Sequence, residues 1–142
     1  RRALDVLSVE LACQRIDENG IKGLWTAYQE FKKAAQGKDA AVIAQADVAF
    51  HDIIVEAVGN LRLQQLVNNL SEQMYRYRFV YINEEEQHDN LIAEHKEIYE
   101  SIASRDKKRA AKAARLHIDN QESSIIRQIR MENESRLNKQ CR

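Results

Sequence analysis

An aspartate and a histidine stand four residues apart within the apolar stretch ADVAFHDIIVEAVGN, residues 46–60. If the stretch is helical, Asp47 and His51 project from the same side of the helix, one turn apart. Phe50 and Ile54 accompany them on a face that is expected to form protein core. The two polar residues are therefore either on the rim of the helix or half of a site.

Two further histidines occupy apolar faces of other segments. His95 lies in NLIAEHKEIYESI, between Leu91 and Ile98, and His117 lies in the alanine-rich run AAKAARLHIDNQ. The small alanines permit a neighbouring helix to approach His117 closely. The fourth histidine, His88, falls in the polar run NEEEQHDN and is predicted to be solvated.

Together, four side chains offer three neutral nitrogens and one anionic oxygen: Asp47, His51, His95 and His117. Buried imidazoles and a buried carboxylate each cost several kcal/mol of desolvation unless they have partners, and one divalent cation would satisfy all four. The set suits zinc, nickel or manganese, and it leaves coordination positions open for water or a ligand. The other interpretation is that each histidine is an ordinary core residue with its own hydrogen bonds.

An arginine is predicted near the inward side of the same helices. Arg78, in YRYRFVYI, is in phase with Met74 and Tyr81, whereas Arg76 is in phase with the polar Asn69. An inward guanidinium needs an anion, and the sequence shows no obvious fixed partner for it. A small carboxylate ligand could bridge the guanidinium and the metal with bidentate geometry. Alternatively, Arg78 reaches the surface or pairs with a helix glutamate.

These residues need helices to hold them, and helical periodicity divides the sequence into six segments. Proline is absent and glycine occurs four times, which favours long helices over a sheet with many turns. Asp39 is a candidate N-cap, Gly37 a candidate stop, and the pair 59–60 a break. Short connections predict an all-α fold, an antiparallel bundle of about six helices with a metal and ligand pocket in its core. The predicted helices cover residues 1–18, 21–36, 40–58, 61–82, 90–104 and 106–136.

Length and charge limit the classes of function. The 142 residues suit a single domain, 1–142, and 22 basic residues balance 22 acidic ones to a net charge of zero. Zero net charge argues against the chain gripping nucleic acid by itself. No run approaches the roughly 20 apolar residues of a membrane span and no signal peptide opens the chain, so a cytoplasmic protein is expected. Cys13 and Cys141 are predicted to be separate thiols and not a disulfide.

Three motifs carry a family resemblance: DVAFHDIIVEAVGN, then EHKEIYESIASRD, then AAKAARLHI. Together with the opening RRALDVLSVELA, they resemble the effector-binding, FCD-type C-terminal domain of GntR-type bacterial transcription regulators. The resemblance spans nearly the whole chain. It implies an all-helical bundle that holds a metal and binds small organic acids beside it.

The resemblance also assigns residues. Carried over position by position, it implies four metal ligands: Asp47, His51, His95 and His117. It places Arg1 where family members often have an arginine that faces the pocket. Six helices, as opposed to seven, favour the vanillate-regulator-like branch of the family. The sequence departs from the family at Asp5, where glutamate is common, and at Arg105, where glycine is common.

The function expected from these observations is ligand sensing in a transcription regulator, and not enzymatic activity. A small carboxylate effector would bind beside the metal, shift helix packing and so change the DNA affinity of an attached reader. The winged helix-turn-helix that would bind operator DNA is expected to be absent from this chain, which agrees with its start at Arg1 without methionine and with its zero net charge. A homodimer is expected, since a two-fold dimer matches two DNA half-sites.

Two rival functions remain open. A metallohydrolase could use zinc bound by histidine and aspartate to activate water, but the sequence contains no HExxH motif. Glu94 and Asp52 each adjoin a proposed ligand, so on a helix they would point about 100° away from it and make poor general bases. The remaining possibility is a purely structural helical bundle.

Overall fold

The computed structural model describes the backbone of residues 1–140 and the side chains of residues 1–137. This part of the chain contains seven α-helices, one short 3-10 helix and no strand, which confirms the all-α prediction. The elements are α1 (Arg2–Arg15), α2 (Glu18–Gly37), α3 (Ala40–Val58), α4 (Leu61–Gln73), α5 (Tyr75–Ile82), η1 (Glu85–Gln87), α6 (His88–Ala103) and α7 (Lys107–Gln140).

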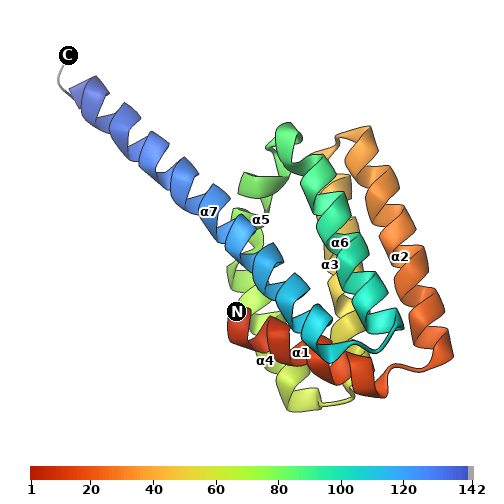
Figure 1. The fold of residues 1–142 in the computed structure, drawn as a ribbon. Coiled ribbons are helices and arrows are strands. Elements are labelled where there is room, and N and C mark those ends of the chain that lie inside the picture. Colours follow the sequence, from red (N-terminus) through yellow and green to blue (C-terminus); the bar gives the residue numbers. More distant parts are fainter. Residues whose placement is uncertain (141–142) are drawn as a thin grey trace.

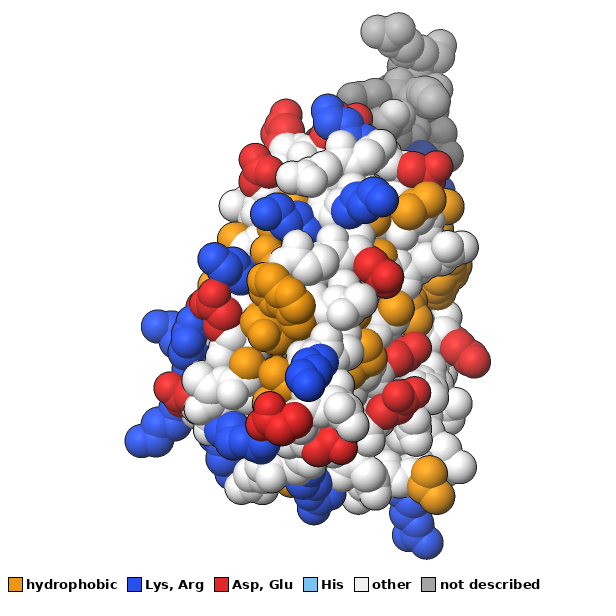
Figure 2. Space-filling model, turned by 90° about the vertical axis from the view of Figure 1, so that its right-hand side faces the viewer, with side chains coloured by type: hydrophobic (Ala, Val, Ile, Leu, Met, Phe, Trp, Pro, Cys, Tyr) orange, Lys and Arg blue, Asp and Glu red, His pale blue; other side chains and the backbone are white. Residues whose placement is uncertain are grey.

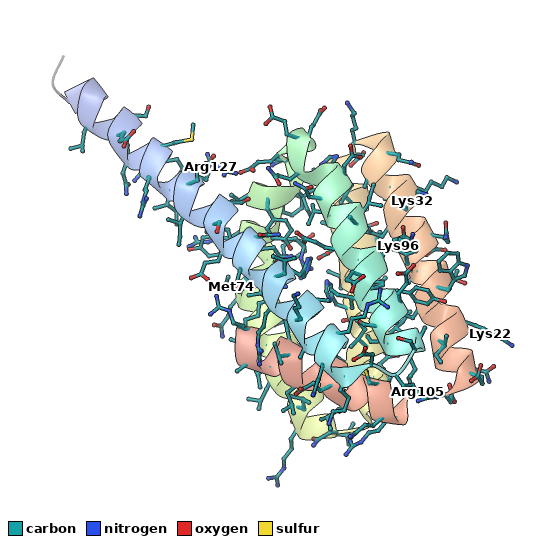
Figure 3. The ribbon with its side chains drawn as sticks, viewed as in Figure 1. Lys22, Lys32, Met74, Lys96, Arg105 and Arg127 are labelled. Atoms are coloured by element: carbon teal, nitrogen blue, oxygen red, sulfur yellow. The ribbon has the colours of Figure 1, made fainter. Side chains whose placement is uncertain are left out.

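The single helix predicted over residues 61–82 is two helices, so the predicted count of about six was too low. Met74 lies between α4 and α5, with φ −90° and ψ 0°, and is labelled at this junction in Figure 3. Leucine and aromatic residues keep helical spacing through the junction, so their periodicity does not reveal the break. The consequence for the site is that Arg78 lies on α5, a helix separate from α4.

The helices form an antiparallel bundle with two crossing members. In Figure 1, α2 runs in the opposite direction to its neighbours α3 and α6, while α1 and α7 cross this group obliquely. α1 packs against α3, α6 and α7, and α7 also packs against α5 and α6. Buried alanines at 110, 111, 113 and 114 allow α1 to lie close to α7. Beyond this contact, α7 extends past the bundle.

The core consists of two clusters of buried apolar side chains. The larger cluster joins α1, α2, α3, α6 and α7 and includes Leu24 and Phe50. The second joins α2, α3, α5 and α6 and includes Phe31 and Ile43. His95 contacts an aromatic ring from each cluster, so it lies where the two clusters meet.

The ends of α3 form as the sequence predicts. The Asp39 side chain accepts backbone hydrogen bonds of 3.0 and 3.2 Å from the first turn of α3. Gly59 ends the helix at φ 65°, and Asn60 caps the start of α4. Gly37 was predicted to stop α2; it is the last helical residue, and Lys38 takes the left-handed conformation at φ 62°. Local capping interactions therefore define both ends of α3, the helix that carries Asp47 and His51.

Arg105 stands where glycine is common in the family, and the structure shows how this position accommodates an arginine. It has φ 58°, the left-handed conformation in which glycine costs least. Its guanidinium donates hydrogen bonds to the carbonyls of Cys13 at 3.1 Å and Ile16 at 2.8 Å, at the end of α1. Figure 3 labels Arg105 in the turn between α6 and α7. The arginine thus satisfies carbonyls that the end of a helix leaves without partners.

His88 was predicted to be solvated in a polar loop, and this prediction was wrong. The loop contains η1, and His88 is the buried first residue of α6. Its Nε2 lies 2.6 Å from the carbonyl oxygen of Ile82, the last residue of α5. Because a carbonyl only accepts hydrogen bonds, Nε2 is the donor. His88 therefore ties the end of α5 to the start of α6.

Replacing His88 with alanine should lower stability without changing metal content. The substitution removes the hydrogen bond to Ile82 and leaves a carbonyl without its partner, a loss of about 1–2 kcal/mol. Urea denaturation of the two proteins measures the difference, and elemental analysis measures the metal. An unchanged unfolding free energy would show that the contact contributes nothing.

The surface carries both signs of charge. The face on the side of α2, shown in Figure 2, has lysine and arginine interspersed with aspartate and glutamate around apolar side chains. An aromatic trio from α2 and α6, Trp25, Tyr28 and Tyr99, has ring centroids 5.0–6.3 Å apart. Among the described residues, no helix combines the length and the apolar character needed to cross a membrane. Cys13 is a buried free thiol, and Cys141 lies outside the described residues.

Candidate metal centre

The structure brings the four predicted ligands into one cluster. Asp47 and His51 come from α3, His95 from α6 and His117 from α7. Each offers one ligand atom, and these atoms all lie within 4.8 Å of one another. Two ligands of a tetrahedral zinc ion, with bonds of about 2.1 Å, are about 3.4 Å apart. A small inward shift therefore suffices for all four to reach one cation.

Aromatic packing fixes the orientation of His95. Its ring is stacked on Phe31 with the centroids 3.8 Å apart, and Phe50 lies against it at 4.8 Å. Its Nδ1 lies 2.8 Å from the carbonyl oxygen of Leu91, one turn earlier on α6, so Nδ1 carries a proton and donates it. Nε2 is therefore the nitrogen that faces the cluster.

Two electron-rich atoms meet at the centre of the cluster. His95 Nε2 lies 3.0 Å from Asp47 Oδ1, and in a neutral imidazole with its proton on Nδ1 this nitrogen has only a lone pair. A lone pair and a carboxylate oxygen repel each other unless a proton or a cation lies between them. A divalent cation at this point would bind both atoms.

Asp47 is held in its ionised form. Burial raises the pKa of its carboxyl, but the neighbouring His51 and His95 side chains outweigh burial and hold the pKa well below its usual range. Asp47 is 1 % exposed, so its negative charge faces the cluster and not solvent. The cluster thus contains one anionic oxygen at neutral pH.

His51 contributes a nitrogen without a hydrogen-bond partner. Its Nε2 is buried, lies 3.6 Å from Asp47 Oδ1 and has no aligned donor or acceptor among the described residues. Burial lowers the pKa of His51 despite the neighbouring carboxylate, so the imidazole is neutral at neutral pH. A buried polar atom without a partner is costly, and a metal ion would satisfy it.

Glu94 holds His117 from outside the cluster. The Nδ1 of His117 lies 2.7 Å from Glu94 Oε2, so Nδ1 donates and Nε2 points into the cluster. Histidines that bind metals commonly donate their other nitrogen to a carboxylate in this way. Burial, reinforced by the neighbouring His95 and His51, lowers the pKa of His117 to about 4. His117 is therefore neutral, as a metal ligand must be.

The donor set fits a divalent cation. Three neutral imidazole nitrogens and one carboxylate oxygen converge, and partners outside the cluster orient two of the imidazoles. Imidazole suits zinc and nickel, and carboxylate oxygen also suits manganese. With four protein ligands, a cation that prefers higher coordination keeps positions for water or a ligand.

Arg78 was predicted to face inward without a fixed partner, and the structure shows one. It is 4 % exposed, and its Nε lies 3.1 Å from Asp47 Oδ2, an ion pair without the alignment of a full hydrogen bond. Its Nη2 donates to Ser71 Oγ at 3.3 Å, while Nη1 has no partner. Arg78 therefore positions the carboxylate of the cluster and retains donor capacity.

A cavity opens beside the cluster. Its lining includes Arg78, His51, His117, Ser8 and Arg1, which come from α5, α3, α7, α1 and the residue before α1. The volume open to the centres of water-sized molecules is about 40 Å³, which is room for a few waters or a small ligand. Arg1 also pairs with Asp5 at 3.1 Å, so the second departure from the family pattern lies at this cavity.

Two residues around the cluster were missed from the sequence. Glu94 was expected only to point away from its neighbour His95; the structure shows that it contacts another of the predicted ligands, His117 on α7. Gln121 is buried one turn after His117, and its amide nitrogen lies 2.8 Å from His117 Nε2. The contact of Glu94 depends on how α6 packs against α7, whereas the spacing of Gln121 and His117 along α7 could have indicated the second contact.

The metal-stripped protein should lose stability as the pH falls from about 6.5 towards 4. The pKa of His117 is about 4 in the folded protein and about 6.5 in the unfolded chain, so the unfolded chain binds more protons in this window. The contribution is fully present above pH 6.5, and protonation of the unfolded chain removes about 2–4 kcal/mol of it by pH 4. The lowered pKa of His51 acts in the same direction.

Thermal melts of metal-stripped protein across this range measure the effect. Because His117→Phe removes the titrating group, its melting temperature should depend less steeply on pH. A wild-type melting temperature that stays constant between pH 6.5 and 4 would contradict the pKa shift.

Comparisons with known proteins agree with the all-helical fold. The FCD domain family matches residues 1–120. The chain is 25% identical over 119 residues to the uncharacterized HTH-type transcriptional regulator YdhC of Bacillus subtilis (strain 168), covering 83% of this chain and 51% of that protein. Its fold is similar to that of E. coli McbR/YncC, with a TM-score of 0.82 at 14% identity, over 90% of this chain and 65% of that one. The chain belongs to the FCD domain family.

Proposed function

We propose that this domain binds a small carboxylate beside a divalent cation and acts as the effector-binding domain of a GntR-type bacterial transcription regulator. The observation that supports it best is the buried cluster of one aspartate and three histidines next to a cavity lined by two arginines. Asp47, His51, His95 and His117 would hold zinc, nickel or manganese. Arg78 and Arg1 would contact the carboxylate of the effector.

The domain is not an enzyme. The FCD family belongs to transcription regulators, and the relative from Bacillus subtilis is also an HTH-type regulator. The metallohydrolase alternative is therefore set aside. Within the site, Glu94 is already bound to His117 and Asn120, which leaves it poorly placed to act as a general base.

DNA binding would belong to another part of the protein. The chain spans about half of the length of the relative it matches, 51%, and 65% of the similar solved chain. Its net charge of zero gives no electrostatic basis for gripping DNA with this domain. A regulator of this kind would act on operator DNA in the bacterial cytoplasm. The seven helices remove the helix-count argument for the vanillate-regulator-like branch, so the proposal does not depend on that branch.

A ligand bound in this cavity would be well placed to change how the helices pack. Its lining comes from α1, α3, α4, α5, α6 and α7, so one ligand contacts most of the bundle. An effector shifts the arrangement of these helices only by binding one arrangement more tightly than another. α5 is the strongest candidate for movement, since Met74 separates it from α4 and Arg78 joins it to Asp47.

The extension of α7 supports the proposed homodimer. Residues 129–137 of α7 are all exposed. A helical segment as short as this one is only marginally stable in water unless it packs against a partner. Ile126, Ile129 and Leu137 form an apolar strip at helical spacing, and Arg130 and Glu134 lie beside it. Antiparallel pairing of two copies would set Glu134 of each chain near Arg130 of the other. Light-scattering mass of the wild type and of Ile129→Asp tests the pairing.

Calorimetric titration of carboxylates into metal-loaded protein tests the proposed function. Hydroxy acids and sugar acids should bind, whereas the corresponding amides and alcohols should not, because they lack the charge that Arg78 and the cation would attract. Equal binding of an acid and its amide would contradict a carboxylate site. If no acid of the panel binds, the proposal that the effector is a small carboxylate is contradicted.

A further inference from the structure

Gln121 contacts the proposed metal ligand His117 at the nitrogen that would bind the metal. It lies one turn later on α7 and is 3 % exposed. Its amide nitrogen is 2.8 Å from His117 Nε2, and its amide oxygen is buried without any hydrogen-bond partner. One end of this amide is thus at the cluster and the other end is unsatisfied.

This arrangement cannot persist when a cation binds His117. His117 Nδ1 keeps its proton and donates a hydrogen bond to Glu94, so Nε2 has one lone pair to offer. That lone pair cannot accept a hydrogen bond from Gln121 and bind a cation at the same time. The amide hydrogens of Gln121 carry partial positive charge and would also repel the cation.

Rotation of the amide by half a turn resolves both conflicts. The oxygen and nitrogen of a glutamine amide occupy almost interchangeable positions. After rotation, the oxygen occupies the position 2.8 Å from His117 Nε2 that the nitrogen holds in the structure. Neighbouring ligands on one metal with bonds of about 2.1 Å lie about 3 Å apart at right angles. The oxygen would then be at the distance of a second ligand to the same ion.

We infer that Gln121 is a fifth protein ligand, which binds the cation through its amide oxygen. This inference rests on the proposed metal centre and adds a residue that spacing of histidines and carboxylates does not identify. A neutral amide oxygen is a hard donor, so it favours five- or six-coordinate ions such as manganese and nickel over tetrahedral zinc. Gln121 therefore influences which metal the domain selects.

A structural role for Gln121 leads to different results. If the amide only orients His117 by hydrogen bonding, glutamate at this position places a carboxylate against the imidazole lone pair without benefit to the metal. If the amide oxygen is a ligand, Gln121→Glu supplies an anionic oxygen to the cation. The direction of the change in metal affinity in this variant distinguishes the two roles.

The experiment measures binding of Co²⁺ and Mn²⁺ to the whole chain, in competition with a chelator. Gln121→Leu should weaken binding of both ions by about tenfold or more, and Gln121→Glu should bind at least as tightly as the wild type. The visible bands of bound Co²⁺ should grow stronger in Gln121→Leu, since a lower coordination number intensifies them. Ser124→Ala, at a buried polar residue of α7 that bonds to Glu84 outside the cluster, should behave as the wild type.

Each outcome decides between the alternatives. Wild-type affinity and an unchanged Co²⁺ spectrum in Gln121→Leu overturn the inference while the four-ligand centre stands. Weaker binding in Gln121→Glu also overturns it, provided that circular dichroism shows a folded protein. If the wild type binds neither ion, the proposed metal centre fails, and the inference fails with it.

Discussion

Replacing His95 with alanine is expected to abolish the stabilisation that divalent cations give to the wild-type protein. His95 is fully buried, and its Nε2 is 3.0 Å from Asp47 Oδ1, so its loss opens the centre of the cluster. A cation that binds only the folded state stabilises it by about 2.7 kcal/mol at one hundred times the dissociation constant. Melting curves with and without zinc, nickel or manganese measure this gain, which should disappear in His95→Ala.

The wild type and His95→Ala must be compared by the rise in melting temperature on adding metal, and not by their absolute melting temperatures. His95 packs on Phe31 and Phe50, so alanine leaves a cavity and lowers stability by about 2–4 kcal/mol even without metal. His88→Ala is the matched control, since it removes another buried histidine of α6 that lies outside the cluster. It should keep the full gain. A His95→Ala protein that is still stabilised by metal would place the binding site elsewhere.

Replacing Arg78 with alanine is expected to weaken binding of both the carboxylate and the metal. The loss of a charged hydrogen bond to the acid corresponds to about 1.5–3 kcal/mol, or roughly 10–100-fold in affinity. Because the Arg78 Nε lies 3.1 Å from Asp47 Oδ2, we expect a further loss of about 10–100-fold in metal affinity.

Two titrations separate these effects. Metal affinity is measured first by chelator competition, and acid binding is then measured with the metal held at saturation. Arg76→Ala is the control, because Arg76 lies on the same helix but is exposed and bonds only to Tyr77 among the described residues. Equal acid affinity in the wild type and Arg78→Ala would show that Arg78 is purely structural. Equal metal affinity would show that its contact with Asp47 does not support the cluster.

Much of the site could be predicted because each ligand lies on a helix face with a clear apolar pattern. Asp47 and His51 are one turn apart, and helical geometry alone places them on one side of α3. His95 and His117 sit among apolar or small residues, so their helices had to turn them inward. The caps at Asp39 and Asn60 follow from local hydrogen bonding, which short sequences determine.

The features that could not be predicted depend on contacts between helices. The break at Met74 interrupts no apolar spacing, and beyond it α5 packs on α3 and α7. His88 has polar neighbours along the chain, but its partner is the carbonyl of Ile82, which a loop brings back to it. Glu94 reaches His117 only because α6 lies against α7. Periodicity assigns a side chain to a face and does not identify its partner across that face.

The direct test of the metal centre is the number of divalent ions bound per chain. The protein is stripped with chelator, saturated with zinc, nickel or manganese, freed of excess ion and subjected to elemental analysis with protein quantitation. About one ion per chain is expected in the wild type, and almost none in a variant with Asp47→Ala and His117→Ala combined. A wild-type protein that retains no ion, or a double variant that retains as much as the wild type, would contradict a metal centre at this cluster.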